Sequence, residues 1–124
     1  QLLDAAGIRW SIIVVSTCEA GTWVDALQDD ETAVIASSSA DVKGSDCAGG
    51  IRPSAFGDVF FGSAMRQSDD LEHAVELARK QLAERKAPRP VMSIGASIAD
   101  RLKSLRSKGS GKVVASLPGT HVKE

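Results

Sequence analysis

The chain has 124 residues, 43% of them hydrophobic, which is the size of one ordinary domain and enough to bury a core. Its charges are mixed along the sequence and sum to −1 at pH 7, which argues against the basic stripe of a nucleic-acid-binding protein and against a polybasic membrane-binding surface. No apolar run approaches the roughly 20 residues of a membrane-spanning helix, and no signal peptide is recognisable. We therefore expect a soluble chain with no nucleic-acid partner and no membrane segment.

The first residues have the pattern of a helix that is ending. Leu2, Leu3, Ala5 and Ala6 are followed by Gly7, which is typical of a last helical turn closed by glycine. No residue that could cap the start of this helix comes before them. This pattern predicts that the intact protein has a part before Gln1, as in a truncated chain or a processed subunit.

Two buried β-strands are predicted, and each ends in small polar residues. The first covers residues 8–16 and is rich in Ile and Val, and the second covers residues 32–39 and contains Ala, Val and Ile. Between them, Thr22 is expected to cap a short helix that contains Trp23. If the strands are parallel neighbours joined by this helix, both end at one edge of the sheet, where open α/β sheets bind their ligands.

The second half of the chain reads mainly as helices. A loop over residues 41–53 leads into a helix over 54–67, and Asp69 with Glu72 forms a capping box for the next helix. A strand over 91–95 and a helix over 97–107 follow. The helix that Asp69 caps has an apolar stripe of Leu71, Ala74, Val75, Ala78 and Leu82, and Glu76 pairs with Lys80 on its solvent-exposed side. We expect residues 1–107 to form the domain and residues 108–124 a loosely packed tail.

Cys18 is the main candidate for catalysis because it follows the first strand at the presumed ligand edge. A small buried cysteine is the alternative, but the turn Glu19-Ala20-Gly21 is a poor place to bury a thiol. The helix that follows could favour the thiolate. Cys47 is interpreted as structural or incidental, and a single disulfide bridge is the less favoured alternative. No CxxC or HExxH motif is present, so we expect no metal and no cofactor.

A cysteine nucleophile normally needs a base, and the sequence offers only two histidines. His73 is expected to lie on a helix surface or in helix packing, and His121 is expected to be solvated in the tail. Asp58 either faces water or lines a specificity pocket. Ser37, Ser38 and Ser39 are interpreted as hydrogen-bonding residues at a strand end.

These motifs, taken in order, resemble the legumain-type C13 cysteine peptidases, especially their bacterial members. The resemblance covers residues 2–107 and rests on the strand followed by Thr-Cys-Glu-Ala-Gly, on Thr-Ala-Val-Ile-Ala-Ser-Ser-Ser-Ala-Asp, on a loop with a cysteine, and on Ala-Phe-Gly-Asp-Val-Phe-Phe. It implies the C-terminal part of a three-layer caspase-like α/β sandwich with a mostly parallel central sheet, seen here as a partial domain.

The resemblance also implies roles for single residues. Cys18 matches the family's nucleophile, while the family's histidine stands in an earlier His-Gly pair that this chain does not contain. Of the substrate-binding positions, Asp58 matches the family's aspartate, Ser45 matches its serine only with a gap, and Ser16 replaces its glutamate. We therefore do not assume that the protein prefers asparagine before the cleaved bond.

The leading hypothesis is a cysteine endopeptidase in which Cys18 forms an acyl-enzyme on a peptide or protein substrate, with a histidine from the N-terminal part of the same domain. By itself this fragment is expected to be inactive. Two alternatives stay open: an inactive peptidase-like binding or scaffold domain, and a transamidase or ligase that uses the same cysteine. The resemblance suggests a bacterial source and a membrane tether outside this region.

Overall fold

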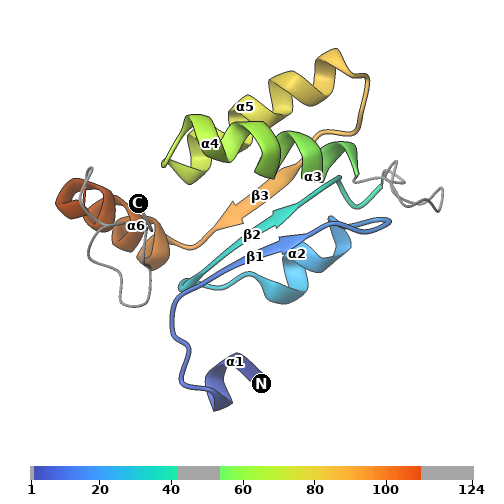
Figure 1. Ribbon diagram of the computed structural model, residues 1–124. Coiled ribbons are helices and arrows are strands. Elements are labelled where there is room, and N and C mark those ends of the chain that lie inside the picture. The colour runs from blue at the N-terminus through green and yellow to red at the C-terminus, as the bar shows by residue number, and fades with distance from the viewer. Residues whose placement is uncertain (1, 42–53, 110–124) are drawn as a thin grey trace, which may run out of the picture.

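A computed structural model describes residues 2–41 and 54–109 of the protein (Figure 1). The first helix ends as the sequence predicts, because Gly7 adopts a left-handed conformation with φ of 74°. No helix in these two ranges is long and apolar enough to cross a membrane. The elements in chain order are α1 (Leu2–Ala5), β1 (Ser11–Val15), α2 (Thr22–Leu27), β2 (Thr32–Ala36), α3 (Ala55–Val59), the π-helical turn η2 (Phe60–Ala64), α4 (Met65–Gln67), α5 (Leu71–Glu84), β3 (Val91–Ile94) and α6 (Ala96–Gly109).

The three strands of the described part form one sheet in the order β1-β2-β3. β1 is parallel to β2, with Ser11 opposite Thr32, so the two strands end at the same edge, as predicted. We call this edge of the sheet the carboxyl edge. β3 is antiparallel to β2, with Val91 opposite Ala36. The mostly parallel sheet expected for the domain is therefore not confirmed. Because α5 ends at the carboxyl edge, β3 starts there and runs in the direction opposite to β2.

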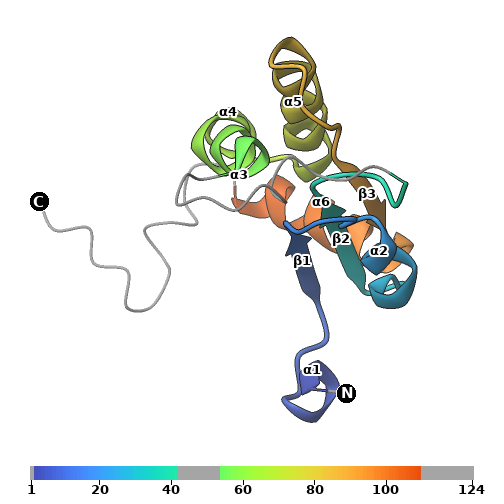
Figure 2. The same cartoon turned by 90° about the vertical axis from the view of Figure 1, so that its right-hand side faces the viewer.

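β2 is buried along its whole length because helices cover both faces of the sheet. α2 contacts β2 on one face, and α3, η2 and α5 lie over the other (Figures 1 and 2). Trp23 is half-exposed on α2 and is not a core residue. The main core fills the α3–α5 face and consists of Ala33, Ile35, Phe56, Val59, Phe60, Ala64, Leu71, Ala74, Val75, Ala78, Leu82 and Ile98.

The predicted helices of the second half are present, with local differences. The helix expected over 54–67 is built from α3, η2 and α4. The predicted apolar stripe of α5 is buried, but its N-cap is Asp70 and not Asp69, since the Asp70 carboxylate accepts the first free amides of the helix. The ion pair on its wet side joins Glu76 to Arg79 and not to Lys80.

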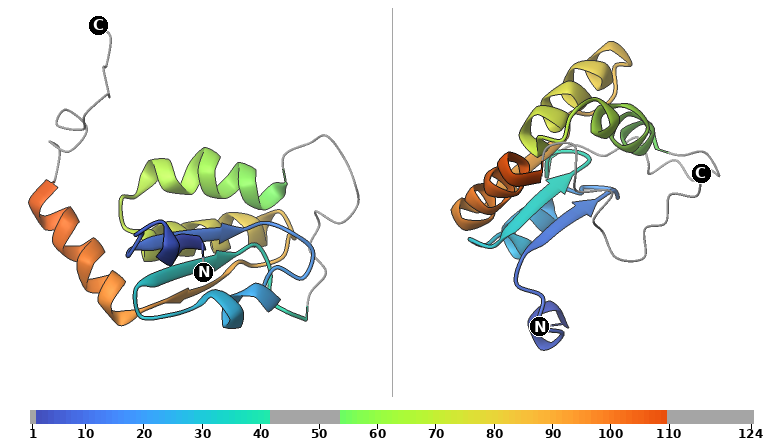
Figure 3. Two further views of the ribbon diagram at one scale, coloured as in Figure 1. Left: turned by 90° about the horizontal axis from the view of Figure 1, so that it is seen from below. Right: turned by 60° about the vertical axis from the view of Figure 1, so that its left-hand side comes forward.

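α6 begins beside the start of β2, at the edge opposite the carboxyl edge (Figure 3). Asp30 holds it there, since its carboxylate accepts hydrogen bonds from the backbone amide and the hydroxyl of Ser97. These bonds lower the pKa of Asp30 below its usual value. A Cβ on Gly95 would lie 2.2 Å from the Asp29 carbonyl oxygen, so this contact requires glycine. Of the apolar residues of α6, Ile98 is buried but Leu105 is about half exposed.

Candidate active site

The turn between β1 and α2 carries Cys18 at the carboxyl edge of the sheet. Cys18 is exposed, and Glu19 beside it has a left-handed backbone with φ of 52°, which is uncommon for a residue other than glycine. The Glu19 carbonyl oxygen accepts hydrogen bonds from the amide of Thr22 at 3.0 Å and from its hydroxyl at 2.8 Å. Thr22 is thus the first residue of α2 and supports the turn, whereas Gly21 and not Thr22 is the N-cap.

Gly21 packs the Cys18 turn directly against the backbone that leaves β2. A Cβ at Gly21 would lie 2.4 Å from the Ala40 amide nitrogen and 2.8 Å from the Ser38 carbonyl oxygen. Real Cβ atoms essentially never approach other atoms this closely. Ala20, one residue earlier, is completely buried. The small residues after Cys18 are therefore required by close packing, which fixes where the turn lies.

The segment that follows β2 places hydroxyl groups beside this turn. Ser37 and Ser38 are buried, and neither hydroxyl has a hydrogen-bond partner among the described residues. Only Ser39 meets the expectation of a strand-end hydrogen bond, since its hydroxyl donates to Asp41 at 2.7 Å and lowers the pKa of that carboxyl. A buried hydroxyl without a partner costs about 1–3 kcal/mol, so Ser37 and Ser38 are an energetic cost at this edge.

The predicted substrate-binding residues Ser16 and Asp58 belong to elements that the structure brings together. The Ser16 hydroxyl, two residues before Cys18, lies 3.4 Å from the Ser54 hydroxyl. Ser54 caps α3 by accepting a hydrogen bond from the Gly57 amide at 2.9 Å. Asp58 lies on the first turn of that helix. The third predicted residue, Ser45, is outside the described residues.

Cys18 is disulfide-bonded in this structure. The sequence has one other cysteine, Cys47, which lies outside the described residues. A bridge was the less favoured alternative from the sequence. Because the thiolate is the reactive form of cysteine, any nucleophilic chemistry at Cys18 requires that this bond be reduced first.

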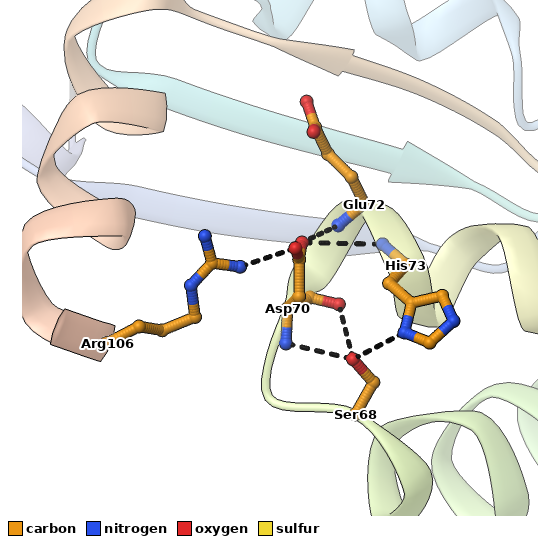
Figure 4. Close-up of polar contacts among 5 residues, drawn as sticks. All are labelled: Ser68, Asp70, Glu72, His73 and Arg106. Atoms are coloured by element: carbon orange, nitrogen blue, oxygen red, sulfur yellow. Dashed lines mark hydrogen bonds and ion pairs between the residues drawn. The ribbon is translucent and has the colours of Figure 1, made fainter. Parts of the chain in front are cut away.

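His73 belongs to a polar cluster that includes serine and aspartate but is not a catalytic triad (Figure 4). Its Nδ1 atom lies 3.1 Å from the Ser68 hydroxyl, which also bonds to the backbone of Asp70. The Asp70 carboxylate accepts from the amides of Glu72 and His73 and pairs with Arg106 at 2.6 Å. It therefore caps α5 and does not orient the imidazole ring, in line with the structural role expected for His73.

His73 is also far from the Cys18 turn. It lies in the first turn of α5, whereas the other end of this helix reaches Asp58 through Arg85 at the carboxyl edge. A helix of 14 residues is about 21 Å long. His73 is therefore not the base for Cys18, and His121 lies outside the described residues. No group of three or more potential metal ligands occurs within residues 2–41 and 54–109.

The ion pair between Asp70 and Arg106 makes stability depend on pH. Partial burial raises the pKa of Asp70, but hydrogen bonds from Arg106 and from backbone amides outweigh it and leave the pKa below its usual value of 3.8. Since the folded state holds the carboxylate charged, its stabilisation is present above pH 3.8 and is lost as the pH falls further. We expect Asp70→Asn to flatten the loss of unfolding free energy below pH 4, measured by urea denaturation, with Asp69→Asn as the control. Equal acid sensitivity of wild type and Asp70→Asn would contradict this role.

A comparison with models of protein families identifies the family of the chain. The profile of the Peptidase C13 family matches residues 1–98, which include the Cys18 turn, both parallel strands and α3 to α5. The chain belongs to the peptidase C13 family. This confirms the resemblance to legumain-like peptidases, and membership of the C13 family suggests cysteine-type peptidase activity. Comparisons with curated proteins and with solved structures each give no match.

Three residues of this C13 candidate site were not singled out from the sequence. Ser54 caps α3 and meets Ser16, Gly21 fixes the Cys18 turn, and Arg85 pairs with Asp58 at 2.8 Å. A serine at the first position of the helix predicted over 54–67 is a signal that could have identified the cap. The partner of Arg85 is 27 residues away, and no local pattern indicates such a contact.

Proposed function

We propose that the protein is a cysteine endopeptidase in which Cys18 is the nucleophile. In its reduced form the Cys18 sulfur attacks the carbonyl carbon of a peptide, the amine leaves with a proton, and water then hydrolyses the acyl-enzyme. The observation that carries the proposal is the exposed position of Cys18 on a closely packed turn at the carboxyl edge, in a chain of the C13 family. The described residues are then part of a caspase-like domain.

The base in this proposal is a histidine from another part of the same peptidase domain. This histidine follows a strand that pairs with β1. Within the described sheet β1 is an edge strand. The Ser11 amide donates to the Glu31 carbonyl and the Val15 carbonyl accepts from Ser37, so these groups face β2 and those of the alternate residue Ile12 face outward. The edge has no proline or charge within β1, and the Ile12 side chain is 47% exposed. A parallel strand added there would end beside Ser16 and Cys18.

A second candidate function is a non-catalytic domain of the C13 fold. One observation favours it: Cys18 is disulfide-bonded and so not available as a thiolate. The two candidates differ in what reduction does. Reduction should activate the peptidase, whereas a binding or scaffold domain has no use for a free Cys18 thiol.

The two candidates are separated by labelling Cys18 with a peptide probe that carries a thiol-directed group, using the full-length protein. We expect no labelling without reductant and labelling at Cys18 after reduction, read out by peptide mass mapping. An excess of unlabelled substrate peptide should protect Cys18, which a merely accessible thiol would not show. Labelling of Cys18 that does not depend on the peptide part of the probe would support the non-catalytic domain.

A further inference from the structure

Asp58 is not a free carboxylate, because Arg85 holds it. The Arg85 guanidinium donates from a terminal nitrogen to Asp58 Oδ2 at 2.8 Å. Both side chains stay about half exposed, at 52% for Arg85 and 56% for Asp58. The pair therefore lies where a ligand could reach it, and its two charges cancel.

The backbone around Arg85 is fixed by the end of α5. Arg85 is the C-cap of the helix. The Lys86 amide bonds to the Ala83 carbonyl at 3.0 Å and the Ala87 amide bonds to the Leu82 carbonyl at 2.9 Å, which is the Schellman arrangement. Lys86 takes the left-handed position of this motif with φ of 55°. The cation at residue 85 thus projects from a well-defined helix end and not from a loose connector.

The pair lies on the same edge of the molecule as the Cys18 turn. Ser16 precedes Cys18 by two residues and meets Ser54, the cap of the helix whose first turn carries Asp58. Arg85 then reaches Asp58 from the end of α5, which runs back to this edge. A continuous set of contacts therefore links the Cys18 turn to the charged pair.

We propose that Arg85 determines the charge selectivity of the Cys18 site. By neutralising Asp58, it keeps this carboxylate from attracting a lysine or arginine side chain on the acyl side of the bond that is cleaved. The inference rests on the proposed peptidase function and on Asp58 as a substrate-binding residue. Without Arg85, an exposed carboxylate would face the substrate, and a cationic side chain would replace the missing guanidinium.

The test compares two peptides that differ only in lysine or alanine before the cleaved bond, using the reduced full-length protein. We expect Arg85→Ala to raise the lysine-to-alanine ratio of kcat/KM about tenfold or more, mainly through a lower KM for the lysine peptide. Arg85→Lys should keep the wild-type ratio, and Arg85→Ala combined with Asp58→Asn should abolish the gain. Arg89→Ala, which removes an exposed arginine from the segment after α5, is the control for net charge.

The outcomes distinguish this inference from the proposed function. An active Arg85→Ala variant with an unchanged lysine-to-alanine ratio would overturn the role of Arg85 alone. An equal gain in Arg89→Ala would also overturn it, because the effect would then be one of overall charge. Failure of the reduced wild type to cleave any peptide would contradict the peptidase function and this inference together.

Discussion

Replacing Cys18 by alanine is expected to lower kcat/KM of the reduced full-length protein by about 10³-fold or more. The sulfur forms the covalent bond in the proposed reaction, and removing such a nucleophile from a well-characterised enzyme costs about 10⁶-fold in kcat. The loss should appear in kcat, with the KM for a peptide little changed, because the substrate-binding residues that we propose, Ser16 and Asp58, remain. Steady-state cleavage of a fluorogenic peptide measures both constants.

This substitution also removes the Cys18 disulfide, so a matched control is needed. Cys47→Ser removes the only other cysteine of the sequence and leaves Cys18 in place. We expect it to retain activity and to need less reductant, while far-UV circular dichroism reports whether each variant is folded. Equal loss of activity in folded Cys18→Ala and Cys47→Ser would contradict Cys18 as the nucleophile, because the loss would then not be specific to its sulfur.

Replacing Gly21 by alanine is expected to damage both stability and activity. The added Cβ would meet backbone atoms of Ser38, Ser39 and Ala40 at 2.4–2.8 Å, and backbone cannot rotate away as a side chain can. Overpacking of this kind costs about 1–3 kcal/mol of unfolding free energy. The turn must also shift, and a displacement of about 1 Å at a catalytic group can cost about 10²-fold in rate. Urea denaturation and peptide cleavage measure the two effects.

Gly62→Ala is the control for Gly21→Ala. A Cβ at Gly62 would meet Asp58 Oδ1 at 3.6 Å, which is ordinary van der Waals contact, and alanine is the better helix former. We expect its unfolding free energy to match or slightly exceed that of the wild type, with cleavage unaffected. If Gly21→Ala behaved like Gly62→Ala, the close packing of the Cys18 turn would not be what positions it.

Much of the fold could be predicted because the signals for it are local. The apolar stripe of α5 repeats at helical spacing and is buried as expected. Apolar runs mark β1 and β2, but only β2 is buried along its length, whereas β1 is partly exposed. The ends of elements were less accurate. Asp70 and not Asp69 caps α5, because either aspartate can act as an N-cap and only the path of the chain selects between them.

The rest depends on contacts between distant parts of the chain. The antiparallel direction of β3 follows from where α5 ends, and the Arg85–Asp58 pair joins residues far apart in sequence. The disulfide at Cys18 likewise has no local signature, since spacing alone does not reveal whether two cysteines meet. The sequence did place Cys18 after a strand, and the structure puts that strand end at the edge where Ser16 and α3 meet.

The most direct test of Cys18 as the nucleophile is the mass of the Cys18-containing peptide after the reduced full-length protein is mixed with a peptide ester and quenched in acid. We expect an added mass equal to the acyl part of the ester, located on Cys18 and released on longer incubation as product accumulates. Product formation with no adduct on Cys18, or with the adduct on another residue, would contradict it.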